Sequence, residues 1–177
     1  EEGAISTNAV NPHIYQEMQF DPTKDFSPIV LLGTSTIVLE VNPEVPVQNV
    51  QEFIEYAKEN PGLIYGAAGT GTSMHLAVAG SERNPQLPDV PTIAEAGVEG
   101  YAVDPWFAVY GPAGIDEEIV EKLNSAFSKA LNSEEVQEIL QNAGFTPKSS
   151  SVQELDELSK SEYERWGQIV EEAQLTM

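Results

Sequence analysis

The most informative stretch of the sequence reads Tyr65-Gly66-Ala67-Ala68-Gly69-Thr70-Gly71-Thr72-Ser73-Met74-His75, and it follows the apolar run Leu63-Ile64-Tyr65. Its three glycines let the backbone turn sharply and approach a ligand closely, because no Cβ blocks positive φ. A glycine loop that leads into a helix presents free N–H groups and the positive end of the helix dipole, which suits an anion. The loop matches neither GxxxxGK[ST] nor GxGxxG, so a nucleotide is not the obvious anion. A flexible loop with an ordinary Ser/Thr cap is the alternative that the spacing leaves open.

Length and composition indicate a folded globular protein. The chain has 177 residues, 41% of them hydrophobic, which suits one ordinary domain or two small lobes. No window approaches the ~18 consecutive apolar residues of a membrane span. The absence of cysteine excludes a disulfide scaffold, a thiolate zinc site and a cysteine nucleophile. The first residues lack the basic and apolar regions of a signal peptide, so we expect a mature form without one.

The charge balance limits the partners of the chain. Asp and Glu number 29 against 8 Lys and Arg, which gives a formal net charge of -21. This charge repels nucleic acid and anionic membranes, so we expect neither as a partner. The acids are dispersed over predicted helix faces, as on a protein from a marine or halophilic source. An anionic ligand would have to be held by local backbone dipoles, because the global field opposes it.

Periodicity predicts strands that alternate with helices. Short helices are expected at 12–17, with Asn11 as N-cap, and at 92–96, and an amphipathic helix at 47–57. Strands are expected at 28–32, 36–41 and 106–110, the first two separated by Gly33. Longer helices are expected at 119–131, at 134–142 after a Ser133 cap and before Gly144, and from the Ser151/Glu154 capping box to 173. This alternation predicts an α/β fold with a largely parallel sheet.

Several longer phrases stand in a definite order along the chain. They are Asn11-Pro12-His13-Ile14-Tyr15, residues 20–29, the glycine loop through Leu76, Leu87-Pro88-Asp89-Val90-Pro91-Thr92-Ile93-Ala94-Glu95-Ala96-Gly97, Trp106-Phe107 before Gly111-Pro112-Ala113-Gly114, and Arg165-Trp166-Gly167. Together they resemble the Bug family, the extracytoplasmic receptors of tripartite tricarboxylate transporters. The resemblance covers nearly the whole chain.

The resemblance implies a fold like that of periplasmic binding proteins, with two lobes of largely parallel sheets flanked by helices. Lobe one would contain residues 1–42 and 107–177, and lobe two residues 43–106. Family members carry an initial strand and glycine loop that nothing upstream of Glu1 supplies here. They also carry a long α/β segment after the glycine loop, whereas here His75-Leu76 runs straight into Ala77. Two interpretations stay open: the second lobe is reduced, with a junction near 76–77, or the sequence joins two stretches that further residues separate in the protein.

The resemblance also implies a set of ligand contacts. Lobe two would contribute Gly69, Thr70, Gly71, Thr72, Ser73 and His75, and lobe one would contribute Ser6, Thr7 and Asn8 from the loop before the first helix. A simple turn that leads into the helix is the alternative for the lobe-one residues, and packing against its own helix is the alternative for His75. Two histidines 62 positions apart give no metal spacing, and no pair of carboxylates stands out as an acid/base dyad.

The expected function is that of a periplasmic, non-enzymatic receptor that needs no cofactor. It would capture a small carboxylate and deliver it to membrane permease subunits. The alternative is a truncated module of the same family that no longer binds solute and self-associates, with a homodimer covering the exposed edge of the reduced lobe. An esterase that uses Ser73 is a third hypothesis, but the segment lacks the GxSxG elbow.

Overall fold

The computed structural model describes residues 2–39, 41, 44–63, 80–83 and 89–175. They belong to two compact units, which are considered separately. Unit 1 draws its described residues from Glu1–Ser35 and Pro105–Met177, and unit 2 draws them from Thr36–Thr70 and Met74–Asp104. The lobe limits expected from the sequence, 1–42 with 107–177 and 43–106, stay a prediction.

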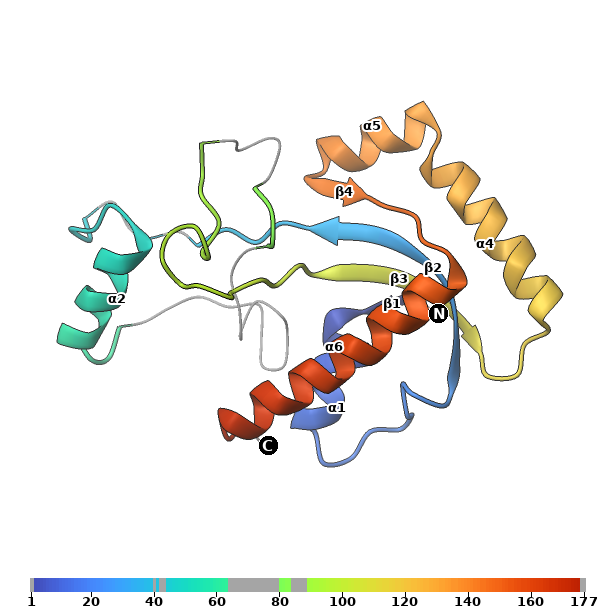
Figure 1. Cartoon of the computed structure of the whole chain (residues 1–177), viewed down its shortest axis with the longest axis horizontal. Helices are drawn as coiled ribbons and strands as arrows, with labels where there is room; N and C mark the ends of the chain where they lie inside the picture. Colours follow the sequence, from blue (N-terminus) through green and yellow to red (C-terminus); the bar gives the residue numbers. More distant parts are fainter. Residues whose placement is uncertain (1, 40, 42–43, 64–79, 84–88, 176–177) are drawn as a thin grey trace. The chain divides into compact units, whose positions relative to one another are not determined.

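Unit 1 is built on a four-stranded sheet with the strand order β1-β3-β2-β4 (Figure 1). The strands are β1 (Glu2–Ala4), β2 (Phe26–Ser35), β3 (Trp106–Pro112) and β4 (Phe145–Pro147). All three pairings are antiparallel. The α/β class is therefore confirmed, whereas the largely parallel arrangement is wrong for the described strands. The chain leaves β2 for unit 2 and re-enters as β3 in the opposite direction, so no βαβ crossover forms between these neighbours.

Strand β2 differs from the two strands expected on either side of Gly33. It continues through Gly33 to Ser35, with register shifts against β3 between Pro28 and Val30 and between Leu31 and Gly33. Gly33 has φ +146°, and a Cβ there would lie 2.2 Å from the Thr146 carbonyl oxygen of β4. The glycine therefore serves a close approach between strands and not a turn. The expected second strand at 36–41 does not form in its described residues, since β-branched residues need a paired neighbour strand.

Helices cover both faces of this sheet, and most of the buried hydrophobic residues lie between the sheet and these helices. The helices of unit 1 are η1 (Ser6–Val10, a π-helical turn), α1 (Asn11–Ile14), α4 (Glu117–Leu131), α5 (Glu134–Asn142) and α6 (Val152–Glu172). Val30 and Val109 pack toward α4 and α5, where Leu131 is buried. On α6, Leu155 and Trp166 are almost fully buried.

Capping explains where most of the long helices begin and end. Ser151 accepts a hydrogen bond from the Glu154 N–H while the Glu154 carboxylate accepts one from the Ser151 N–H, which confirms the capping box of α6. Gly144 has φ +76° directly after α5, as expected of a C′ glycine. The Ser133 prediction is only half right: Ser133 is the N-cap residue of α5, but its hydroxyl donates to the Ala130 carbonyl and caps nothing.

The short helices differ from expectation because neighbouring turns extend or replace them. Asn11 is the first residue of α1 and not its cap, because η1 already continues into it, and α1 ends at Ile14. Residues 92–96 form a hydrogen-bonded turn closed by Ala96 N–H on the Thr92 carbonyl, not a helix. In unit 2, α2 (Val50–Glu59) begins three residues later than expected, directly after its N-cap Asn49, whose side chain accepts a hydrogen bond from the Glu52 N–H.

Within the described residues, no helix combines the length and apolar character that crossing a membrane requires.

Candidate functional site

The lobe-one residues of the predicted site lie directly after an edge strand. Ser6, Thr7 and Asn8 are the first residues of η1, and only Ile5, itself in the right-handed helical region, separates them from β1. They were expected in a loop, so the structure corrects that detail. Because Ala4 pairs with Phe107 of β3, the start of η1 is anchored to the sheet by the strand before it. The segment from Ser6 to Ile14 is continuously helical and begins where a strand ends.

Thr7 and Asn8 hold this turn together. The Thr7 hydroxyl accepts a hydrogen bond from the Ala4 N–H at 3.0 Å and donates to Asn8 Oδ1 at 2.7 Å. The Ala4 carbonyl lies 3.2 Å from the same hydroxyl and is the weaker of its two acceptors. Asn8 is only 8% exposed. The side chains of both residues therefore stabilise the first turn of η1.

A glycine and a tyrosine support the turn from the sheet. A Cβ on Gly3 would lie 2.4 Å from Tyr110 Cε2 and 2.9 Å from Asn8 Oδ1, so no larger residue fits there without displacement. The Tyr110 hydroxyl lies 2.7 Å from Ser159 Oγ, and Ser159 donates in turn to the Leu155 carbonyl. Tyr110 is therefore the donor to Ser159. Burial raises the pKa of Tyr110 to about 12, so the hydroxyl stays protonated at neutral pH.

Neither Gly3 nor Tyr110 was singled out from the sequence. A glycine inside a strand is a signal of close backbone approach and could have indicated the first. Tyr110 carries no local sequence signal, because its role depends on the pairing of β1 with β3.

The chemistry available at this turn is hydrogen-bond donation. The first N–H groups of a helical segment have no partner within the helix, and the half-buried Ser6 hydroxyl makes no hydrogen bond among the described residues. The turn itself carries no carboxylate, imidazole or amine. It can therefore hold an anion by dipoles and neutral donors, whereas it has no group for acid/base or nucleophilic catalysis.

A small cavity lies behind the turn within unit 1. It has a volume of about 70 Å³ and is lined by Asn8, Phe26 and Tyr110 together with residues of α6. Ligand pockets typically measure roughly 300–1,000 Å³, so this cavity suits a few water molecules and not a dicarboxylate.

The other predicted contacts cannot be placed. Gly69, Thr70, Gly71, Thr72, Ser73 and His75 lie outside the described residues. The other histidine, His13, is held against α6: its Nε2–H donates to the Tyr163 carbonyl at 2.9 Å, and a Cβ added at Gly167 would lie 2.9 Å from its ring. Among the described residues, no group of carboxylates and histidines could hold a metal ion.

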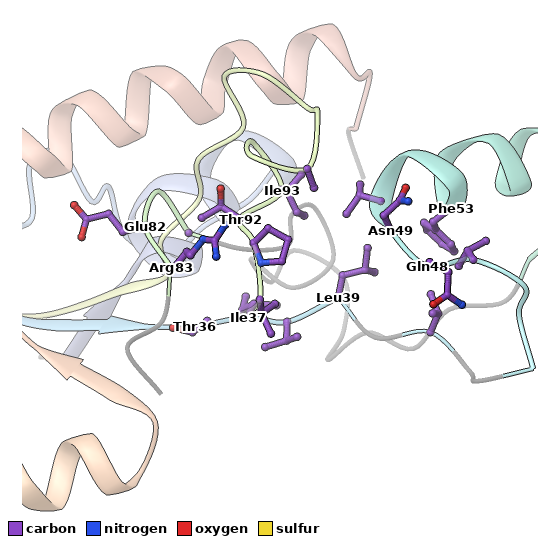
Figure 2. Close-up of a pocket in the computed structure, with 18 residues that line it drawn as sticks. Thr36, Ile37, Leu39, Gln48, Asn49, Phe53, Glu82, Arg83, Thr92 and Ile93 are labelled. Carbon is purple, nitrogen blue, oxygen red and sulfur yellow. The ribbon is translucent and has the colours of Figure 1, made fainter. Parts of the chain in front are cut away.

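A larger hollow lies within unit 2 (Figure 2). It has a volume of about 280 Å³, and mostly apolar side chains line it, among them Leu39, Phe53 and Ile93. At its rim, Arg83 Nε donates to Glu95 at 2.8 Å. Glu95 also accepts from the Thr92 N–H, and its pKa is lowered by Arg83 first and by Thr92 second. Residues 92–96 of the long phrase therefore stabilise unit 2, because Glu95 links Arg83 to the turn at Thr92.

Comparison with known proteins gives a family for the chain. The sequence model of the tripartite tricarboxylate transporter family receptor matches residues 2–80 and 75–175. This is the kind of receptor that the Bug resemblance predicted. The family is one of transport receptors and not of enzymes, which confirms the expectation of a non-enzymatic chain.

Similar proteins agree with this match. A UPF0065 protein in the tcbD-tcbE intergenic region of a Pseudomonas species is 30% identical over 223 positions, which cover 94% of this chain and 66% of that protein. The chain thus spans just under two thirds of that relative's length.

Solved structures share the fold. An R. palustris protein, Rpa4515 with adipate, is 26% identical with a TM-score of 0.88, and the match covers 99% of this chain and 78% of that one. The periplasmic binding protein BugD is 18% identical with a TM-score of 0.81, over 99% of this chain and 78% of BugD, which shows the fold alone. The fold class is thus that of periplasmic binding proteins, and the chain belongs to the tripartite tricarboxylate transporter receptor family.

Proposed function

We propose that this chain is an extracytoplasmic receptor that captures a small carboxylate and delivers it to the permease of a tripartite tricarboxylate transporter. The observation that carries the proposal is the family match, which extends over residues 2–80 and 75–175. The adipate in the R. palustris neighbour, whose sequence is 26% identical, supports a dicarboxylate as the first ligand to test. A receptor for such a transporter works outside the cytoplasm, where the permease can receive its ligand.

The turn at the start of η1 is the proposed contact on unit 1. The free N–H groups of its first residues and the Ser6 hydroxyl would donate to one carboxylate group. Thr7 and Asn8, also predicted as contacts, would act mainly by holding the turn, because the Thr7 hydroxyl already bonds to Ala4 and Asn8. The predicted contacts between Gly69 and His75 stay a prediction of the sequence.

Charge makes this mode of binding unusual. The chain carries a net charge of -21, so a dianion approaches against the global field. Salt screens that repulsion over a Debye length of about 10 Å at 0.1 M, whereas contacts to backbone N–H groups at short range are screened much less. We therefore expect the affinity for adipate to rise, not fall, when NaCl is added.

Isothermal titration calorimetry of the whole chain with adipate tests the proposal, with adipamide as a neutral ligand of the same shape. Adipate should bind and adipamide should not. A ligand present at a hundredfold excess over its Kd stabilises the folded state by about 2.7 kcal/mol, so a thermal melt should show the same selectivity.

Substitutions test whether the turn at the start of η1 binds adipate. Ser6→Ala should weaken adipate binding roughly twofold to tenfold, the usual effect of losing one hydrogen bond. Ser161→Ala is the matched control, because this serine is exposed on α6 and its hydroxyl donates to the Leu158 carbonyl. A folded chain that binds no di- or tricarboxylate, or that binds adipamide as well as adipate, would overturn the proposed function.

A further inference from the structure

Unit 2 exposes apolar side chains that a folded unit would normally bury. The apolar face of unit 2 is defined here by six residues around the hollow: Ile37, Leu39, Val47, Phe53, Val90 and Ile93 (Figure 2). Leu39 is 38% exposed and Val90 is 44% exposed. Of the exposed large hydrophobic residues in the described chain, most lie in unit 2, namely Val38, Leu39, Val41, Leu63 and Val90.

The interior of unit 2 is correspondingly thin. Among the described residues, Val103 is the one buried hydrophobic residue of this unit, whereas unit 1 contains the rest of the core. Helix α2 is amphipathic, with Val50, Phe53 and Ile54 on one side, yet none of its residues is buried. An apolar helix face gains most of its stability from packing against another element. The described part of unit 2 contains no second helix or strand that could pack on this face of α2.

Relatives of the chain carry additional residues, and the family match divides close to this face. The alignment with the Pseudomonas relative extends over 223 positions, whereas this chain has 177 residues, so at least 46 positions of the alignment face gaps in this chain. The family model matches in two stretches that meet at residues 75–80. Gly80 lines the hollow, and the next residue, Ser81, is fastened to Asp104 by two hydrogen bonds. The residues that relatives add there would lie next to the apolar face, and they have no counterpart in this chain.

We propose that a second copy of this chain covers the apolar face of unit 2, in a twofold-symmetric dimer. The size of the hollow that the face surrounds fits this occupant, because 18 residues line it, close to the roughly 20–30 residues per side of a standard protein interface. Its charge fits as well, because these residues include one carboxylate, Glu82, and one guanidinium, Arg83. Arg83 is already paired with Glu95 at the rim, so the lining carries little charge on a chain of charge -21, and the same patch can meet itself with little local repulsion.

Sedimentation velocity of the whole chain over a range of concentrations tests the proposal. We expect a reversible dimer that becomes tighter when NaCl is raised, because salt screens the repulsion between two chains of charge -21 and does not weaken apolar contacts. Leu39→Glu and Val90→Glu should each raise the dimer dissociation constant at least about tenfold, since each places two unpaired carboxylates in the symmetric interface.

Both substituted side chains are already exposed, so the variants should keep the wild-type circular dichroism and melting behaviour. Ile139→Glu is the matched control, because Ile139 is 60% exposed but lies on α5 of unit 1. It should dimerise like the wild type. A wild-type chain that stays monomeric at low and high salt would overturn the proposal, and so would equal dissociation in the Ile139 variant. Stabilisation of a monomer by octanoate, lost in Leu39→Glu, would assign the face to an apolar ligand instead. Adipate binding is measured separately, so the two proposals can fail independently.

Discussion

Tyr110 offers the sharpest test of how the candidate site is supported, because its hydroxyl affects stability in opposite directions at neutral and alkaline pH. The side chain is 4% exposed and its hydroxyl donates to Ser159 Oγ at 2.7 Å. In Tyr110→Phe the ring that packs against Gly3 remains, whereas the hydrogen bond to Ser159 is lost. Ser159 keeps its bond to the Leu155 carbonyl, so no buried donor is left unpaired. We expect the free energy of unfolding at pH 7 to fall by about 1 kcal/mol.

At alkaline pH the order of stability reverses, and the wild type becomes less stable than Tyr110→Phe. The pKa of Tyr110 is raised in the folded state from 10.0 to about 12, chiefly by burial. A folded-state pKa above the unfolded value contributes stability that is fully present below the unfolded pKa and is lost as the pH rises through the folded one. A tenfold change in proton affinity corresponds to about 1.4 kcal/mol, so the wild type should lose about 2.7 kcal/mol in total and about half of that by about pH 11. The phenylalanine variant has no such loss, and the two stability curves should cross at about pH 11.

Urea unfolding followed by tryptophan fluorescence at a series of pH values measures this difference, because Trp106 and Trp166 both belong to unit 1. Every other titratable group is the same in both proteins, so its contribution cancels in the difference. A difference in unfolding free energy that stays constant between about pH 8 and pH 11 would refute the reasoning, because it would mean that Tyr110 ionises as freely in the folded as in the unfolded chain.

Two further substitutions test packing and capping in unit 1. Gly3→Ala places a Cβ 2.4 Å from the Tyr110 ring and should destabilise unit 1 by about 1–3 kcal/mol in urea unfolding; an unchanged midpoint would mean that the ring can move aside. Ser151→Ala removes the hydroxyl that caps α6 through the Glu154 N–H and should lower thermal stability by about 1 kcal/mol. Ser133→Ala should cost less, because that hydroxyl caps nothing, and equal losses in the two variants would contradict the capping assignment.

Features with a local cause could be predicted from the sequence. The capping box at Ser151 and the positive φ of Gly144 depend on residues within a few positions, and both are as expected. Apolar periodicity located α4, α5 and α6 for the same reason. Ordered phrases along the chain were specific enough to indicate the family, since they match residue types in sequence and need no knowledge of contacts.

Features that depend on distant partners could not be predicted. Gly33 looked like a break between two strands, whereas the close approach of β4 makes it part of one. Strands and helices alternate along the chain as they do in a parallel sheet, yet every described pairing is antiparallel, because strand direction depends on where the chain re-enters unit 1.

The same distinction between local causes and distant partners applies to the candidate site. The sequence by itself determined the family, and it predicted an anionic ligand and the choice of Ser6, Thr7 and Asn8 as contacts to test. Only the tertiary structure decided how that turn is held, because the Tyr110 ring reaches Gly3 through the pairing of β1 with β3, two strands from separate segments of unit 1. Only the tertiary structure located the apolar face of unit 2. An apolar residue is exposed or buried according to what packs on it, and that depends on the whole fold.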